Sequence, residues 1–86
     1  MKPVLLYGTP FCGYCAAARR LLAEKGVVFE EVDLAAEPGR RAEMVERAKG
    51  ARSVPQLFVG GEHVGGFSEM WELDRSGKLD ALLAGG

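Results

Sequence analysis

The chain has 86 residues, of which 48% are hydrophobic and 27% charged, and its formal net charge is -1. This length suits one domain, which we expect over residues 1–86. The hydrophobic fraction is too high for a disordered polymer, and the near-zero net charge argues against a nucleic-acid-binding protein with a basic surface. No apolar run approaches the ~20 residues of a membrane span, and the run near Met1 is too short for a signal peptide, so we expect an unprocessed cytoplasmic protein.

The first half of the chain predicts a strand, a helix and a second strand. Residues 4–7 form a short apolar run followed by glycine, threonine and proline, which is typical of a buried strand. Residues 15–25 are nearly all good helix formers, and Gly26 directly after them is a typical helix end. Residues 27–32 then predict a second strand, less regular than the first.

The second half of the chain predicts two more strands and three more helices. Gly60-Gly61 between two strand-like runs indicates a hairpin turn, and Ser68 is a good N-cap for the helix after it. We place these elements as a helix over 40–49, strands over 56–59 and 62–64, a helix over 69–75 and a short helix over 80–83.

This order of elements predicts an α/β fold. The βαβ unit of the first half requires a parallel crossover, whereas the closing pair of strands forms an antiparallel hairpin. We therefore expect a four-stranded mixed sheet flanked by helices on both faces.

The motif that carries chemistry is the pair Cys12-Gly13-Tyr14-Cys15. A disulfide between these cysteines closes so short a loop that it stabilises the fold little, which favours a chemical role. The pair lies between a predicted strand and a predicted helix, so Cys12 is placed at the helix N-terminus, where free N–H groups and the dipole favour a thiolate. We expect Cys15, one turn further on, to be more buried, to have the higher pKa and to act as the resolving thiol.

Other uses of the cysteine pair fit less well. Zinc needs two more ligands, and His63 is the only further histidine or cysteine in the chain; we expect His63 to be a surface or half-buried residue rather than a catalytic base. An iron–sulfur cluster shared by two chains, with Cys12 from each subunit and two external thiols, satisfies the ligand count and stays open. Thiol–disulfide chemistry is the favoured interpretation.

Two later segments add to this interpretation. Val54-Pro55 precedes a predicted strand, where proline marks either a strand start or edge or a cis bond. Residues 65–69, Gly-Gly-Phe-Ser-Glu, precede a predicted helix. The free N–H groups of Phe67 and Ser68 there either hold a carboxylate or belong to an ordinary turn and N-cap.

Three segments together resemble the glutaredoxin family. Residues 9–15 (TPFCGYC), 50–59 (GARSVPQLFV) and 65–69 (GGFSE) occur in the family's order, and three motifs in order are more specific than one CxxC pair. The resemblance covers nearly the whole chain. It implies a thioredoxin-like fold and glutathione as reductant and co-substrate, with no metal required.

The resemblance also implies roles for individual residues. Cys12 is the nucleophile that takes glutathione from a mixed disulfide, and Cys15 closes the intramolecular disulfide used on protein disulfides. Val54 pairs its backbone with the cysteine of glutathione, and Arg40 or Arg41 meets the glycyl carboxylate. The residues implied to bind glutathione are Tyr14, Val54, Pro55, Gly66, Phe67, Ser68 and Glu69.

Three departures from the family pattern are visible. Gly13 stands where proline is common, and a small residue there accompanies iron–sulfur binding in some relatives. Residues 8–11 lack the lysine that often precedes the motif, so stabilisation of the thiolate rests more on backbone N–H groups. Ser53 replaces the commoner threonine, which is a small change.

We therefore expect a monomeric dithiol oxidoreductase of cell redox homeostasis. Its partners are glutathione and disulfide-containing or glutathionylated proteins, rather than nucleic acids or membranes. Two alternatives follow from the same residues. One is a dimeric carrier of a glutathione-ligated 2Fe–2S cluster, and the other is an oxidoreductase reduced by a thioredoxin reductase.

Overall fold

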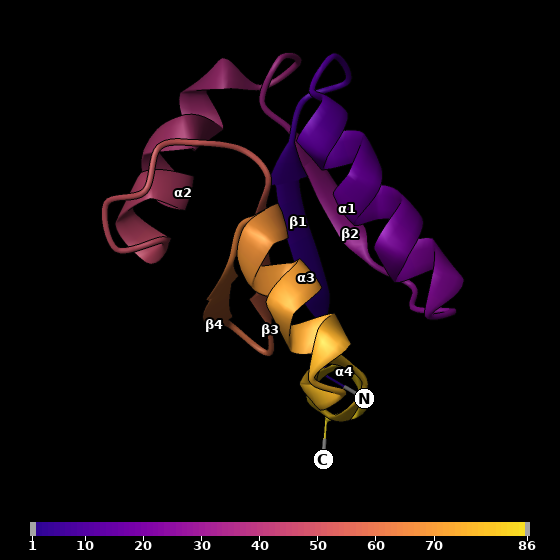
Figure 1. Cartoon of the computed structure of the whole chain (residues 1–86). Helices are drawn as coiled ribbons and strands as arrows, with labels where there is room; N and C mark the ends of the chain where they lie inside the picture. The colour runs from indigo at the N-terminus through magenta and orange to yellow at the C-terminus, as the bar shows by residue number, and fades with distance from the viewer. Residues whose placement is uncertain (1, 86) are drawn as a thin grey trace.

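Four strands and four α-helices follow one another along residues 2–85, the part of the chain that the computed structural model describes (Figure 1). A short 3-10 helix, η1, precedes the second α-helix. The elements are β1 (Val4–Gly8), α1 (Gly13–Glu24), β2 (Glu30–Asp33), η1 (Pro38–Arg40), α2 (Arg41–Arg47), β3 (Gln56–Val59), β4 (Glu62–Gly65), α3 (Phe67–Arg75) and α4 (Lys78–Ala84).

The strands form one mixed sheet in the order β2-β1-β3-β4. The central strand β1 pairs in parallel with β2 and antiparallel with β3, and β4 closes the hairpin at the edge. The register places Tyr7 opposite Gln56 and Phe58 opposite His63, with an irregularity between Leu57 and Phe58. The predicted four-stranded mixed sheet is confirmed.

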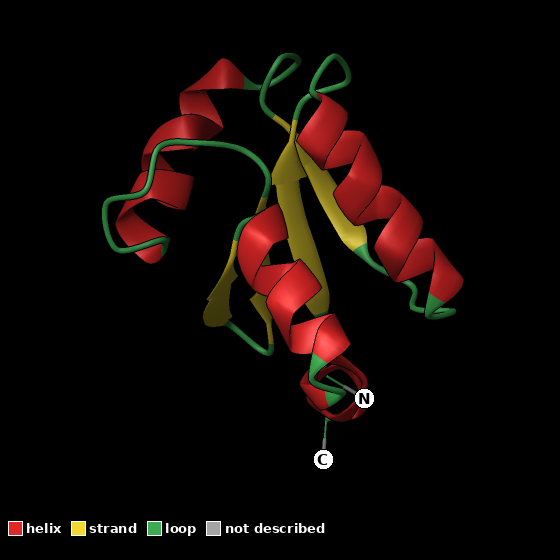
Figure 2. Ribbon diagram, in the orientation of Figure 1, coloured by secondary structure: helices red, strands yellow, loops and turns green. Residues whose placement is uncertain are grey.

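Helices cover both faces of this sheet, also as predicted. Figure 2 shows α1 and α2 on opposite sides of the strands. Alternation along β1 sends Leu6 into a buried cluster with α1, α3 and α4, and Tyr7 into a second cluster under α2. The buried residues of the first cluster are Val4, Leu6, Ala18, Leu22, Leu57, Val59, Met70, Leu79 and Leu83. Those of the second are Tyr7, Val32, Leu34, Met44, Ala48 and Phe58.

The start predicted for the second strand is wrong. β2 covers Glu30–Asp33 rather than 27–32, because its pairing with β1 begins at Glu30. Val27 and Phe29 lie before the strand and pack against the first core cluster. Their apolar side chains therefore contribute to the core without joining the sheet.

The predicted helix over 40–49 is shorter and has two parts. Pro38 opens η1, where its missing N–H removes no helical hydrogen bond. The α-helical part then runs over Arg41–Arg47, and Lys49 beyond it has a positive φ of 58°.

The predicted N-cap of α3 is also wrong. Gly66, not Ser68, is the N-cap, and α3 begins at Phe67. Glu69 decides this start, because its Oε1 accepts a hydrogen bond of 2.7 Å from the Gly66 N–H. Ser68 therefore lies in the first turn of the helix.

The last helix, α4, is longer than predicted and covers Lys78–Ala84. Within residues 2–85, each helix is too short or too polar to cross a membrane.

Candidate active site at the cysteine pair

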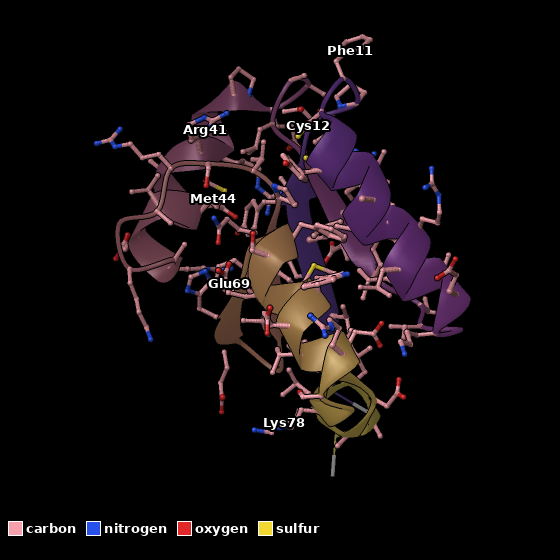
Figure 3. The ribbon with its side chains drawn as sticks, in the orientation of Figure 1. Phe11, Cys12, Arg41, Met44, Glu69 and Lys78 are labelled. Carbon is pink, nitrogen blue, oxygen red and sulfur yellow. The ribbon has the colours of Figure 1, made fainter. Side chains whose placement is uncertain are left out.

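The cysteine pair lies at the start of α1, directly after the end of β1. α1 begins at Gly13 rather than at residue 15, because Cys12 is its N-cap and the Cys12 sulfur accepts a hydrogen bond of 3.4 Å from the Cys15 N–H. Figure 3 shows Cys12 at the end of the molecule where Phe11 projects into solvent. Cys12 is half-buried and Cys15 is 0% exposed, and both are free thiols.

The two sulfurs have opposite pKa shifts. Partial burial raises the pKa of Cys12, but hydrogen bonds from the Cys15 thiol and from the N–H groups of Cys15 and Tyr14 outweigh it, so the pKa is lowered. The Arg19 charge lowers it further with a smaller effect. Burial raises the pKa of Cys15, and the neighbouring Cys12 raises it further. These shifts follow the predicted order, in which Cys15 is the more buried cysteine and has the higher pKa.

Gly8 at the end of β1 makes room for the buried sulfur. A Cβ atom at this position lies only 3.2 Å from Cys15 Sγ, so a larger residue displaces the Cys15 thiol. The loop between Gly8 and the cysteines is held by Arg19, whose Nη2 donates to the Thr9 carbonyl at 2.8 Å and whose Nε pairs with Glu31 at 2.7 Å. Sequence reasoning did not identify this anchoring pair.

A loop from the other half of the chain borders Cys12. The peptide bond between Val54 and Pro55 is cis, which was one of the two interpretations of this proline. The Val54 carbonyl lies 3.8 Å from the Cys12 sulfur and accepts a hydrogen bond from its thiol. This contact joins residues 42 positions apart in the sequence.

A groove runs from this loop to the N-terminus of α3. It contains all seven residues that were predicted to bind glutathione, together with two that sequence reasoning missed, Ser53 and Gln56. The complete lining is Tyr14, Ser53, Val54, Pro55, Gln56, Gly66, Phe67, Ser68 and Glu69. The missed signal was a polar residue, Gln56, inside an otherwise apolar strand next to Pro55.

The walls of the groove have distinct chemistry. The rings of Tyr14 and Phe67 lie 6.1 Å apart at one side, and Tyr14 is 68% exposed. Gly66 allows the backbones to approach closely, since a Cβ atom there lies 3.2 Å from the Pro55 carbonyl. The first N–H groups of α3 and the Glu69 carboxylate share this end of the groove, so it offers both positive and negative partners.

The structure distinguishes the two candidate arginines of the second helix. The Arg40 guanidinium pairs with Glu43 at 3.0 Å and with Glu37 at 3.6 Å. Arg41 instead donates through Nη1 to the Arg52 carbonyl, immediately before the groove residue Ser53. Figure 3 shows Arg41 at the same end of the molecule as Cys12.

Among residues 2–85, no group of three or more His, Cys, Asp or Glu side chains is placed to hold a metal ion.

Comparison with known proteins agrees with this geometry. The family model described as Glutaredoxin matches residues 4–64. The chain belongs to the glutaredoxin family. It is 46% identical over 84 residues to the glutaredoxin of Pseudomonas aeruginosa, a match that covers 98% of this chain and 99% of that protein. As a family member with both cysteines in place, it is a thiol–disulfide oxidoreductase.

Solved glutaredoxins share the whole architecture. The buckwheat glutaredoxin–glutathione complex superposes with a TM-score of 0.90 at 30% identity and covers 98% of this chain and 78% of that chain. The solution structure of the Brucella melitensis glutaredoxin has a TM-score of 0.83 at 47% identity and covers 100% of this chain and 94% of that chain. The thioredoxin-like fold implied by the sequence motifs is thereby confirmed.

Proposed function

We propose that this glutaredoxin uses glutathione to reduce protein–glutathione mixed disulfides and protein disulfides. The observation that carries the proposal is a groove that starts at Val54, beside the Cys12 sulfur, and reaches the N-terminus of α3, where N–H groups and the Glu69 carboxylate offer partners for a charged group. The buckwheat relative with the same fold was solved with glutathione, which supports the same ligand here.

The first reaction needs only Cys12. Its thiolate attacks the glutathione sulfur of a mixed disulfide, the sulfur–sulfur bond breaks, and the protein sulfur leaves as a thiolate and takes a proton. A second glutathione thiolate then attacks the glutathione sulfur bound to Cys12. Oxidised glutathione forms, and Cys12 is released as a thiolate, which its lowered pKa makes a good leaving group.

The second reaction also needs Cys15. After Cys12 attacks a protein disulfide, the Cys15 thiol loses its proton and attacks the Cys12 sulfur, which releases the reduced protein. Two glutathione molecules then reduce the Cys12–Cys15 disulfide and become oxidised glutathione. The Cys15 N–H lies 3.4 Å from the Cys12 sulfur, so the resolving residue is adjacent to the bond that it breaks.

Each end of glutathione has a partner in the proposed complex. The Val54 backbone pairs with the cysteine of glutathione. The N–H groups of Phe67 and Ser68 hold the γ-glutamyl carboxylate, and Glu69 accepts from the γ-glutamyl amine. Of the two arginines, we assign the glycyl carboxylate to Arg41, because Arg40 is engaged by Glu43 and Glu37.

The test is the reduction of a glutathionylated peptide with glutathione as the electron source. Cys12→Ser is expected to abolish turnover. Cys15→Ser is expected to keep removal of glutathione but to lose reduction of a protein disulfide. Turnover by Cys12→Ser contradicts the assignment, and turnover that requires thioredoxin reductase in place of glutathione contradicts the choice of reductant.

We further infer that the protein acts in the cytoplasm as a monomer. A compartment buffered by thiols supplies the reduced glutathione that the proposed reactions consume. Sedimentation of the reduced protein tests the monomer, and immunolocalisation tests the compartment.

A further inference from the structure

One polar side chain in the core has no role in the proposed reaction. Gln56, the first residue of β3, is 4% exposed and is the one buried polar or charged residue within 2–85. Alternation along β3 places it on the same face as Phe58, under α2. A buried amide needs partners for both its nitrogen and its oxygen, so the partners of Gln56 indicate what it does.

The hydrogen bonds of Gln56 determine which way its amide points. Its Nε2 donates to the Ser53 carbonyl at 3.1 Å and to the Ser53 hydroxyl at 3.3 Å. Because a carbonyl only accepts, the amide nitrogen must face Ser53. The Oε1 atom then faces His63 Nε2 at 2.7 Å. Since Oε1 also only accepts, His63 must carry a proton on Nε2.

His63 is held in place by its own surroundings. It lies on β4 opposite Phe58, and the two rings are 5.1 Å apart. Burial lowers the pKa of His63, and the Lys49 charge lowers it further, while Glu69 raises it by a smaller effect. The neutral ring carries one N–H, so the choice of ring nitrogen decides whether Gln56 has a donor. His63 is not among the residues that line the groove.

We propose that His63 is a positioning residue: its Nε2–H orients the Gln56 amide, and that amide holds the Ser53 backbone and the adjacent Val54 carbonyl beside Cys12. The inference rests on the proposed function, because Val54 is the residue whose backbone pairs with glutathione. Its carbonyl lies 3.8 Å from the Cys12 sulfur. Without a donor at position 63, the buried Oε1 atom loses its partner, so the amide is no longer fixed in the orientation that holds the Ser53 carbonyl.

The tautomer of His63 is the first test, and it needs no activity. Long-range proton–nitrogen NMR correlations of the reduced wild-type protein at neutral pH show which ring nitrogen carries the proton. We expect the Nε2–H tautomer. The Nδ1–H tautomer overturns the proposal. If the wild type shows no glutathione-dependent turnover, the proposed function fails, whereas this measurement still decides the orientation of Gln56.

The second test uses two variants with a glutathionylated peptide as substrate and glutathione as reductant. His63→Phe keeps a ring beside Phe58 but removes the donor. We expect its KM for the peptide to rise roughly three- to tenfold, the effect of one lost hydrogen bond, with little change in kcat. His63→Gln places an N–H near the position of Nε2 and is expected to restore most of the wild-type KM. An unchanged KM in His63→Phe, or equal KM values in both variants, overturns the proposal.

A double-mutant cycle tests whether the effect passes through Gln56. Gln56→Leu is expected to raise the KM by itself, and His63→Phe is then expected to add nothing. Additive effects overturn the proposed connection. Glu62→Gln, an exposed neighbour on the same strand, is the matched control and is expected to leave the KM unchanged.

Discussion

The two faces of the sheet are stabilised in different ways. The face under α1, α3 and α4 is a continuous apolar cluster that includes Leu6 and Leu22. The face under α2 combines apolar packing with hydrogen bonds from the buried residues Tyr7 and Gln56 to less buried partners. There the Tyr7 hydroxyl donates to Glu43 at 2.5 Å, and Gln56 joins His63 to Ser53. The first face stabilises the fold by apolar packing, and the second also fixes the position of loops through hydrogen bonds.

The candidate active site combines elements that pack on the two different faces. The first face contributes α1, which carries Cys12 and Cys15. The second contributes the segment around Val54, which Gln56 and Arg41 hold through the backbone carbonyls of Ser53 and Arg52. Changes in the apolar face should therefore lower stability most, whereas changes in the polar links should lower it less and also alter loop position or titration.

The largest expected effect is in the apolar face. Leu22→Ala removes a fully buried side chain of α1 and leaves a cavity, so we expect the free energy of unfolding to fall by about 2–5 kcal/mol. Urea unfolding followed by circular dichroism measures this change. Leu21→Ala, a half-buried neighbour on the same helix, should lose less. An equal loss in the two variants contradicts the assignment of Leu22 to the core.

A smaller loss is expected from the polar link under α2. Tyr7→Phe removes the hydroxyl that donates to Glu43 but keeps the ring beside Phe58, so we expect a loss of about 1 kcal/mol. Tyr14→Phe makes the same chemical change at a residue that is 68% exposed and should leave the unfolding free energy unchanged. Identical stability of Tyr7→Phe and wild type shows that the link does not stabilise α2.

The same link predicts a dependence on pH. The Arg40 guanidinium and the Tyr7 hydroxyl hold the pKa of Glu43 at about 2, below its usual 4.5. Because the folded-state pKa is the lower one, the stabilisation is complete above 4.5 and is lost as the pH falls toward 2. Unfolding measured across this range should show a decline that is reduced in Glu43→Gln. Glu46→Gln, at an exposed position of the same helix, should retain the full decline.

The smallest expected effect is at the cysteine pair. The Cys15 thiol is the strongest of the hydrogen-bond donors that lower the pKa of Cys12. Cys15→Ala removes this donor, so the pKa of Cys12 should rise. Cys15→Ser keeps a hydroxyl donor and should change it less. The pH dependence of Cys12 alkylation gives both values, and the same pKa in both variants contradicts the role of the thiol.

Local patterns predicted the chemistry well and some boundaries poorly. The CxxC pair before a run of helix formers was enough to place Cys12 at a helix N-terminus and Cys15 inside the helix. Ser68 looked like the N-cap of α3, but Glu69 bonds back to Gly66 and moves the start forward. Val27 and Phe29 looked like strand residues, yet the register with β1 admits pairing only from Glu30. A helix or strand propensity is a property of one residue, whereas an N-cap or a strand register depends on the residues with which it forms hydrogen bonds.

The lining residues of the candidate groove also fall into those that the sequence predicted and those that it did not. Its seven predicted residues come from motifs that are each contiguous in the sequence, and each motif had a recognisable form. Ser53 and Gln56 were identified only by contacts in the folded chain, where the Gln56 amide bonds to Ser53 and to His63 on the neighbouring strand β4. The sequence of β3 shows a glutamine among apolar residues but not which partner it finds.

The resemblance of three motifs indicated the family, and from the residues themselves the order of elements, the mixed sheet and the place of Cys12 at a helix N-terminus could be predicted. These follow from periodicity, spacing and helix-end electrostatics, which act over a few residues. Only the tertiary structure decided that Val54 lies against Cys12, that Arg41 rather than Arg40 faces the groove loop, and that Gln56 links His63 to Ser53. Those contacts join distant segments, and their geometry depends on how the two faces of one sheet pack at the same time.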